Sequence, residues 1–189
     1  MAHKIFSDAE RLRERSRYAE ALLLYRKALA AFRKSGDREG VIDSLLSIGD
    51  TSRMVGAFLQ ARKAYGEAIS LSTTLRDRLK RADAMVGSGL SLRALGEWKK
   101  ALDLFSKARS VYEKESDKFG VAFTLWAEGG AFRVGGDLRS AISSFGRAKK
   151  IYESFLPTGI VSGSASCELD DAQRAIGYCL CGLGGASRV

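Results

Sequence analysis

Arginine recurs at intervals of forty residues along this 189-residue chain, at Arg13, Arg53, Arg93 and Arg133. A guanidinium group is a planar fork of N–H donors that binds a carboxylate or a phosphate through two parallel hydrogen bonds. A repeated arginine is therefore suited to docking acidic groups of a partner. For Arg13 and Arg53 a local ion pair is the alternative, because an acidic residue, Glu10 or Asp50, lies three residues earlier on the same helical face. Leu90 and Gly130 hold that place in the other two copies.

Residues that could support catalysis or hold a metal ion are scarce. The single histidine, His3, lies at the N-terminal end, where chains fray, and no glycine-rich phosphate loop follows a strand pattern. Cys167, Cys179 and Cys181 all fall in the last 23 residues, far from His3, which disfavours a Cys/His metal site. Cys179 fits an apolar stripe and is expected in the core, with Cys167 and Cys181 exposed. We therefore expect no enzyme activity, no metal and no cofactor.

The net charge of +9 is spread along the chain. The densest basic run, residues 11–17, lacks interleaved aromatic residues and has Glu10, Glu14 and Glu20 in or beside it. Nucleic-acid binding is therefore a weaker alternative. No segment approaches the roughly 18–20 apolar residues of a membrane-spanning helix, and the N-terminus does not resemble a signal peptide. These features favour a soluble, cytoplasmic protein.

Alanine and aromatic residues share the forty-residue period of the arginines. The first alanines are Ala21, Ala61, Ala101 and Ala141, the second are Ala28, Ala68, Ala108 and Ala148, and the aromatic residues between them are Tyr25, Tyr65, Phe105 and Phe145. A fixed period of this length indicates one supersecondary unit used four times.

Residues 38–75 represent the unit. Asp37 is a plausible N-cap for a helix that runs to about Val55, and Gly56 ends that helix. A second helix is expected from about Phe58 to Leu75. Asp77 and Asp117 are the counterparts of Asp37, and Gly96, Gly136 and Ser16 are those of Gly56. A single helical hairpin cannot bury its apolar face alone, so the units must stack.

The second unit carries Leu45, Gly49, Gly56, Phe58, Ala61, Tyr65 and Ala68. This pattern resembles the tetratricopeptide repeat, and the resemblance covers roughly residues 2–153. It implies an all-α fold, a right-handed α-solenoid of helix-turn-helix repeats (a TPR-like superhelix) whose first helices line a concave groove. The forty-residue period and the missing closing proline resemble a subgroup with longer helices, seen in kinesin light chains and in cell-polarity scaffolds that bind G-protein regulators.

The domain organisation follows from the period. We expect four TPR-like hairpins within residues 1–153, at about 1–36, 37–76, 77–116 and 117–153, and a linker over 154–165. One more amphipathic helix is expected over 166–185, as a C-terminal capping helix or a truncated fifth repeat. Within it, the stretch from Ala175 to Tyr178 looks like the first helix of another unit.

The resemblance implies that the groove binds peptides or partner helices. Groove positions transferred to this sequence are Arg53, Arg93 and Arg133 for charge, and Leu90, Phe123 and Trp126 for apolar contact. The alternative for the first two arginine copies is the local ion pair, and for Trp126 it is packing against the third hairpin. The expected function is a scaffold or adaptor that binds an acidic or amphipathic segment of a partner protein. Homo-oligomerisation through the C-terminal helix is a further alternative.

Overall fold

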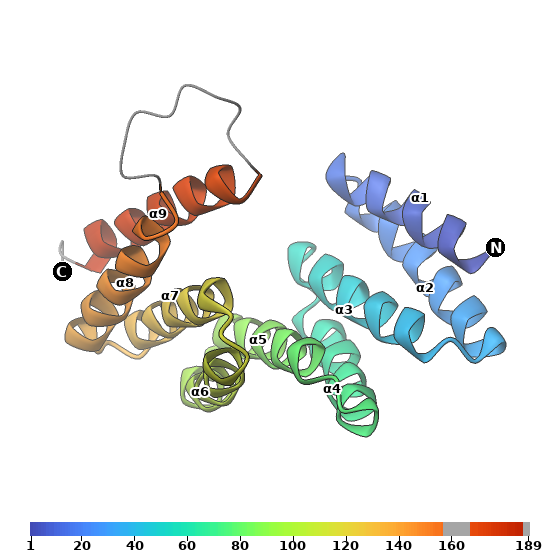
Figure 1. Ribbon diagram of the computed structural model, residues 1–189, viewed down its shortest axis with the longest axis horizontal. Helices are drawn as coiled ribbons and strands as arrows, with labels where there is room; N and C mark the ends of the chain where they lie inside the picture. The colour runs from blue at the N-terminus through green and yellow to red at the C-terminus, as the bar shows by residue number, and fades with distance from the viewer. Residues whose placement is uncertain (157–166, 187–189) are drawn as a thin grey trace. The chain divides into compact units, whose positions relative to one another are not determined.

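The computed structural model describes residues 1–156 and 167–186, which form helices joined by turns and include no strand (Figure 1). The helices are α1 (Ala2–Glu14), α2 (Tyr18–Ser35), α3 (Arg38–Met54), α4 (Phe58–Leu75), α5 (Arg78–Ala94), α6 (Trp98–Lys114), α7 (Lys118–Val134), α8 (Leu138–Glu153) and α9 (Cys167–Ala186). The all-α prediction is confirmed. The two helices expected in the unit at residues 38–75 are α3 and α4.

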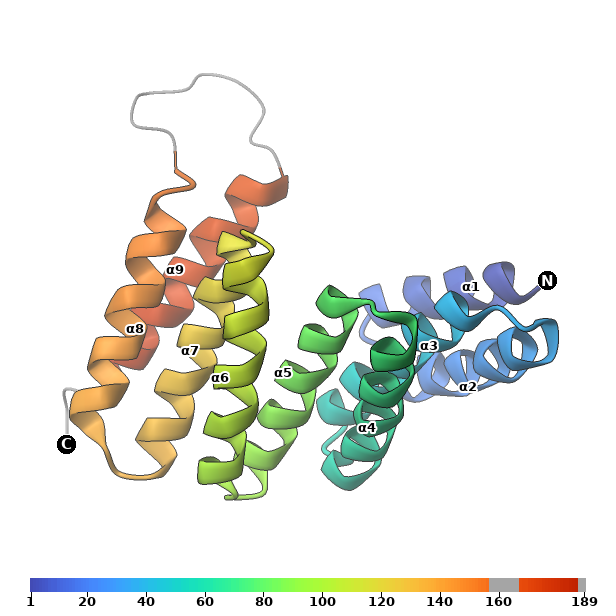
Figure 2. The same ribbon diagram turned by 60° about the horizontal axis from the view of Figure 1, so that its bottom comes forward.

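The helices form two compact units, Met1–Leu95 with α1 to α5 and Gly96–Val189 with α6 to α9. In the first unit each helix packs on the next, and α3 also touches α1 and α5. In the second unit α6 packs on α7, α7 on α8 and α8 on α9, while α9 also touches α7 (Figure 2). Each unit is therefore a stack in which the first helices of successive hairpins are neighbours.

Aspartate side chains begin three of the first helices, as predicted. The Asp37 carboxylate accepts a hydrogen bond from the Gly40 N–H at 2.9 Å, and Asp77 and Asp117 do the same for Lys80 and Gly120 at 3.0 and 2.8 Å. Each cap satisfies one backbone donor of the first turn and is worth about 1 kcal/mol. The caps therefore fix where each hairpin starts.

The turn inside each hairpin needs one residue with positive φ. Gly56, Gly96 and Gly136 have φ of 77°, 79° and 81°, and Ser16 takes the same place in the first hairpin with φ of 58°. Glycine adopts this left-handed backbone without steric penalty. The predicted helix stops are therefore confirmed, including the serine that replaces glycine.

Aromatic rings of the second helices fill notches made by glycines of the first helices. A Cβ added at Gly49 or Gly87 would stand 2.5 or 2.3 Å from the Tyr65 ring, and one at Gly129 or Gly182 would stand 2.8 Å from the Phe145 ring. These distances are far below van der Waals contact. The ring of α4 is thus held between α3 and α5, and the ring of α8 between α7 and α9.

The repeated alanines around these rings are all fully buried: Ala21, Ala28, Ala61, Ala68, Ala101, Ala108, Ala141 and Ala148. Their short side chains let the helices approach closely enough for the rings to reach the glycines. The sequence period therefore marks the core.

Helix α9 packs on α8 as a further first helix, but in a different register from the one expected. The sequence pattern placed Gly177 within the repeat signature, whereas the residue that meets Phe145 is Gly182, and no atom of the described residues lies within 4 Å of a Cβ added at Gly177. Cys179 is buried and Cys181 is exposed, as predicted. The side chain of Cys167 and most of the predicted linker lie outside the described residues.

Replacing Gly87 with alanine tests the notch. Tyr65 is locked between two helices and cannot retreat, so overpacking should outweigh the gain of up to ~1 kcal/mol from removing a helical glycine. We expect Gly87→Ala to lower the free energy of unfolding by about 1–2 kcal/mol in urea denaturation followed by circular dichroism.

Gly66→Ala is the matched control, because Gly66 is also helical but has nothing within 4 Å of an added Cβ. It should stabilise the protein by up to ~1 kcal/mol. Equal changes in the free energy of unfolding for Gly87→Ala and Gly66→Ala would contradict the close packing of Tyr65 against Gly87.

Candidate functional site

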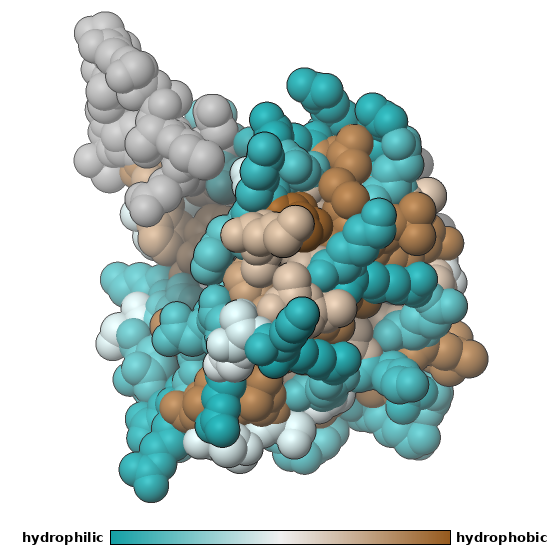
Figure 3. All heavy atoms as spheres, turned by 90° about the vertical axis from the view of Figure 1, so that its right-hand side faces the viewer, coloured by the Kyte–Doolittle hydropathy of each residue, from teal (hydrophilic) through white to brown (hydrophobic). Residues whose placement is uncertain are grey.

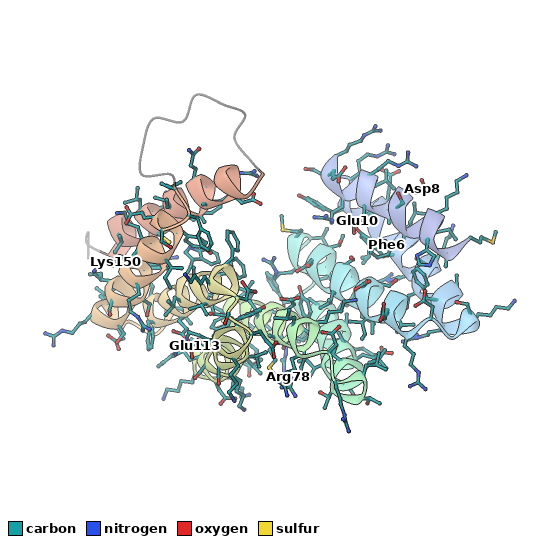
Figure 4. All side chains as sticks on the ribbon, in the orientation of Figure 1. Phe6, Asp8, Glu10, Arg78, Glu113 and Lys150 are labelled. Carbon is teal, nitrogen blue, oxygen red and sulfur yellow. The ribbon has the colours of Figure 1, made fainter. Side chains whose placement is uncertain are left out.

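Glu10 connects three elements of the first unit. Its carboxylate accepts hydrogen bonds from Arg13 at 2.5 Å, from the Tyr25 hydroxyl at 2.5 Å and from the Ser47 hydroxyl at 3.3 Å. Figure 4 places Glu10 on the side of α1 that faces α3. The hydrogen bond to Glu10 raises the pKa of Arg13, and burial, followed by the same carboxylate, raises the pKa of Tyr25. Arg13 therefore stays protonated, and its positive charge is balanced by Glu10.

The next repeat has the same arrangement with a shorter acid. The Tyr65 hydroxyl donates to Asp50 at 2.6 Å, and the Arg53 guanidinium lies 3.9 Å from the same carboxylate oxygen. Burial, together with the charge of Asp50, raises the pKa of Tyr65, so the hydroxyl stays protonated and can donate. The local ion pair proposed as the alternative for Arg13 and Arg53 is therefore present at both positions.

The third and fourth repeats change the acid and the ring together. Their acid positions hold Leu90 and Gly130, and their ring positions hold phenylalanine, Phe105 and Phe145. A buried hydroxyl without an acceptor is costly, so tyrosine is expected only where a carboxylate can receive its hydrogen bond. The arginine of these repeats therefore has no acid at the position three residues earlier.

The arginines of the later repeats differ in exposure. Arg93 is half-buried near the end of α5, whereas Arg133 is exposed near the end of α7. Arg133 forms no ion pair with any residue that the structure describes. Leu90, expected to provide apolar contact, is only 5% exposed, so it presents almost no surface to a partner.

Phe123 and Trp126 lie on α7 in the same unit as Arg133. Their rings are stacked, with centroids 5.5 Å apart and an interplanar angle of 26°, and both side chains are half-buried. Phe123, Trp126, Gly130 and Arg133 follow one another at helical spacings of three, four and three residues and share one face of α7. We call these four residues the α7 strip.

Tyr178 of α9 extends the α7 strip and was not predicted. Its ring centroid lies 6.3 Å from that of Trp126, and its side chain is exposed. Trp126 also packs against the core that α9 completes, whereas the alternative predicted packing against the third hairpin. The position of Tyr178 follows from the register of α9 on α8, which the forty-residue period does not specify.

A buried ion pair in the second unit was also not predicted. Arg109 of α6 donates to Glu128 of α7 at 3.1 Å, and Glu128 is buried. Burial raises the pKa of Glu128, and the guanidinium of Arg109 opposes that shift. The same position holds Ile48 and Ser88 in earlier repeats, so the repeat pattern gives no signal for an acid there.

A cavity of about 540 Å³ opens between the ends of α6, α7 and α8. Lys118 and Lys150 line it together with Glu113 and Asp117 (Lys150 and Glu113 in Figure 4). The two signs of charge balance, so the cavity does not favour an anion. Among the residues that the structure describes, no cluster of histidine, cysteine and acidic side chains could hold a metal ion.

The sequence profile described as "Tetratricopeptide repeat" matches residues 80–154, from the first turn of α5 to the residue after α8. Residues 80–154 therefore match the tetratricopeptide repeat family. Its fold is an all-α solenoid of helix-turn-helix repeats. None of the described helices is both long enough and apolar enough to cross a membrane.

Solved structures with the same fold cover nearly the whole chain. BtubC (BKLC) from P. vanneervenii is 16% identical with a TM-score of 0.69, covering 98% of this chain and 78% of that one. A kinesin light chain-like protein of Podosopora anserina, with nearly identical TPR-like repeats, is 12% identical with a TM-score of 0.68, covering 98% and 88%. MamA RS-1, as a double mutant, is 17% identical with a TM-score of 0.58, covering 99% and 94%. No curated protein sequence gives a significant match.

A double-mutant cycle on Asp50 and Tyr65 tests the pairing of acid and hydroxyl in these repeats. Asp50→Leu with Tyr65→Phe reproduces the composition of the third repeat, Leu90 and Phe105. We expect the double variant to be about 1 kcal/mol more stable than the sum of the single effects predicts, because neither partner is left alone. Additive effects in urea denaturation would show that the hydrogen bond contributes nothing.

The raised pKa of Glu128 predicts a specific pH dependence. A raised pKa in the folded state means that the folded protein holds the proton of Glu128 more tightly than the unfolded chain does. The contribution of Glu128 to the free energy of unfolding is therefore largest below its ordinary pKa of 4.5, and it is lost as the pH rises. Glu128→Gln keeps an acceptor for Arg109 and removes this loss. Its melting temperature relative to wild type should therefore increase between about pH 4 and pH 7.

Glu113→Gln is the control, because Glu113 is the more exposed partner of the same arginine, with its Oε1 3.4 Å from Arg109. It should change the pH profile of the melting temperature less than Glu128→Gln does, because the charge of Glu113 is the smallest of the causes that raise or lower the pKa of Glu128. A flat difference between Glu128→Gln and wild type over this range would rule out the proposed titration.

Proposed function

We propose that this protein is an interaction scaffold that holds an acidic or amphipathic segment of a partner protein. Tetratricopeptide folds generally mediate protein–protein interaction or scaffolding. The proposed contact residues are Arg53, Arg93 and Arg133 for charge, with Phe123 and Trp126 for apolar contact. Leu90 is buried and is therefore not a contact residue.

The observation that carries the proposal is the α7 strip. Two stacked, half-buried aromatic rings lie on the same face of α7 as the exposed Arg133, which forms no ion pair with any described residue. Partly exposed aromatic side chains beside arginine are the residues that dominate binding energy at protein interfaces. A segment with an apolar side chain about 10 Å from a carboxylate fits the seven-residue rise from Trp126 to Arg133.

The binding free energies expected from charge and from apolar burial assign different roles to the two ends of the α7 strip. An exposed ion pair contributes only about 0.2–1 kcal/mol, so Arg133 alone cannot hold a partner. Burial of the aromatic rings provides more, at ~25 cal/mol per Å² of apolar surface removed from water. We infer that Phe123, Trp126 and Tyr178 provide affinity and that Arg133 selects for acidic segments.

The first unit is expected to contribute less. Arg13 and Arg53 already form ion pairs with Glu10 and Asp50, so a carboxylate of a partner must compete with an internal one. Elsewhere many basic side chains are also paired, for example Arg17 with Glu20, Lys107 with Asp103 and Lys149 with Glu153. This pairing reduces the free positive charge and favours a protein partner over nucleic acid.

Selection of peptides from a random phage-displayed library tests the function. We expect the selected peptides to combine acidic residues with an aliphatic or aromatic residue. Binding of the best peptide, measured by fluorescence anisotropy, should weaken at least tenfold (about 1.4 kcal/mol) with Trp126→Ala and also with Arg133→Glu.

Arg139→Glu is the matched control, because it makes the same charge reversal at an exposed position on α8, outside the α7 strip. It should leave the affinity within twofold. Peptides without acidic residues, or equal losses with Arg133→Glu and Arg139→Glu, would refute a specific acidic site on α7.

A further inference from the structure

A second site lies where α4 ends and α5 begins, within the first unit. A cavity of about 160 Å³ opens there, lined by Ser72, Thr73, Arg76, Asp77, Arg78 and Arg81. We call residues 72–81 the α4–α5 junction. The chain has equivalent junctions before α3 and before α7, so the forty-residue period allows the three to be compared position by position.

The α4–α5 junction lacks the aromatic side chain that the other junctions bury. At the position of Ser72, the other repeats have buried aromatic residues, Phe32, Tyr112 and Tyr152. Before α3 and α7 the ring lies against a glycine of the next helix, because a Cβ added at Gly40 or Gly120 would stand 2.4 or 2.5 Å from it. Lys80 holds that glycine position in α5. A contact between a ring and a glycine is therefore replaced by a serine and a lysine.

Arginine replaces smaller residues at two further positions of the junction. Arg81 stands where α3 and α7 have Val41 and Val121. Arg76 stands where the junction before α3 has Gly36, and its φ of 60° lies in the left-handed region that glycine adopts more readily. Both replacements place an arginine on the wall of the cavity. These departures from the repeat exchange apolar packing for hydrogen-bond donors.

Two polar atoms of the junction lack a hydrogen-bond partner. The Ser72 hydroxyl and the Nε of Arg81 are buried, and neither forms a hydrogen bond with any of the described residues. Ser72 as a whole is 0% exposed. Leaving such groups unsatisfied destabilises a folded protein, and both residues line the cavity. A ligand with several acceptor oxygens in the cavity can satisfy them.

The charge of the cavity wall favours an anion. Three of the lining residues are arginine and one, Asp77, is acidic. The Asp77 carboxylate already accepts the Lys80 N–H at 3.0 Å as the cap of α5. The amino group of Lys80 is paired with Asp43 at 2.7 Å, so it does not add to the charge of the wall. The wall therefore carries an excess of positive charge, unlike the balanced cavity at the ends of α6, α7 and α8.

The surroundings of the junction are polar as well. Thr73, Arg76 and Arg78 are exposed, and Figure 4 labels Arg78 at the start of α5. Figure 3 faces the N-terminal helices, where hydrophilic side chains cover most of the visible surface, with hydrophobic atoms between them. A charged ligand suits such a surface better than an apolar one.

We propose that the α4–α5 junction binds a single phosphate group. A phosphate ester carries a charge of about −1.5 to −2 at pH 7, which offsets the excess positive charge of the wall. Guanidinium groups bind phosphate through paired N–H donors, and the Ser72 hydroxyl donates to a further oxygen. The cavity volume is about five times the ~30 Å³ that one water molecule occupies in the liquid, which suits one phosphate group and little more. A carboxylate uses fewer of these donors, because it has only two oxygens.

Isothermal titration calorimetry with inorganic phosphate tests the site, at constant ionic strength so that charge screening does not change. We expect saturable binding of one phosphate per chain. Arg81→Val restores the residue of α3 and α7, and Ser72→Ala removes the unsatisfied hydroxyl, so each should weaken phosphate binding at least tenfold. Each should also leave the melting temperature in phosphate-free buffer unchanged or higher, because it removes a buried group that has no partner. Loss of binding is then distinct from unfolding.

Arg38→Val is the matched control. Arg38 is the first residue of α3, as Arg78 is of α5, and its junction keeps the aromatic residue Phe32. This substitution should leave the phosphate affinity within twofold. Phosphoserine with blocked termini distinguishes the source of the phosphate. Binding tighter than that of inorganic phosphate identifies a phosphorylated side chain, and weaker binding identifies the free anion.

Two results would overturn the proposal. The first is that neither inorganic phosphate nor blocked phosphoserine shows saturable binding to the wild-type chain. The second is phosphate binding that Arg81→Val and Ser72→Ala leave within twofold. The phosphate site does not rest on the α7 strip, which is tested by other variants and another ligand. Arg81→Val should leave the affinity of the selected peptide unchanged, so failure of one site is distinct from failure of the other.

Discussion

The insertion of an aromatic ring between two glycines is the contact on which the stacking of the repeats depends. One ring, Tyr65 or Phe145, touches the first helix of its own hairpin and the first helix that follows. It therefore closes a hairpin and joins that hairpin to the next element at the same time. The buried alanines on either side of the ring keep the helices close enough for this contact. Without it, a hairpin has an apolar face and no fixed neighbour.

The tip of the ring links this packing to the surface. Where the ring is tyrosine, its hydroxyl reaches the edge of the first helix and needs an acceptor, which Glu10 and Asp50 supply. Those carboxylates in turn form ion pairs with Arg13 and Arg53. Where the ring is phenylalanine, no acceptor is required, and leucine or glycine holds the acid position. The choice of one buried side chain thus influences the charge that each repeat presents to a partner.

The sequence predicts most of the fold because its signals are local. Asp37, Asp77 and Asp117 cap helices through contacts three residues away, and Gly56 marks a turn by its own backbone. The site is less predictable because it depends on contacts between helices. Leu90 has a groove position in the repeat pattern, yet its burial depends on what packs around α5. The pair of Arg109 and Glu128 joins two helices and has no counterpart in the other repeats. Tyr178 reaches Trp126 through a register that the forty-residue period does not set.

The ring contacts also bear on how the chain folds. Tyr65 lies 16 residues from Gly49 and 22 residues from Gly87, while Phe145 lies 37 residues from Gly182. Contacts this close in sequence are typical of fast-folding helical proteins, since little chain entropy is lost before each contact forms. The longer span to Gly182 is less than twice the span to Gly87, so it adds less than about 0.6 kcal/mol of loop-closure entropy. Each ring can therefore find its notches as soon as the next helix has been synthesised, and α9 joins the array last.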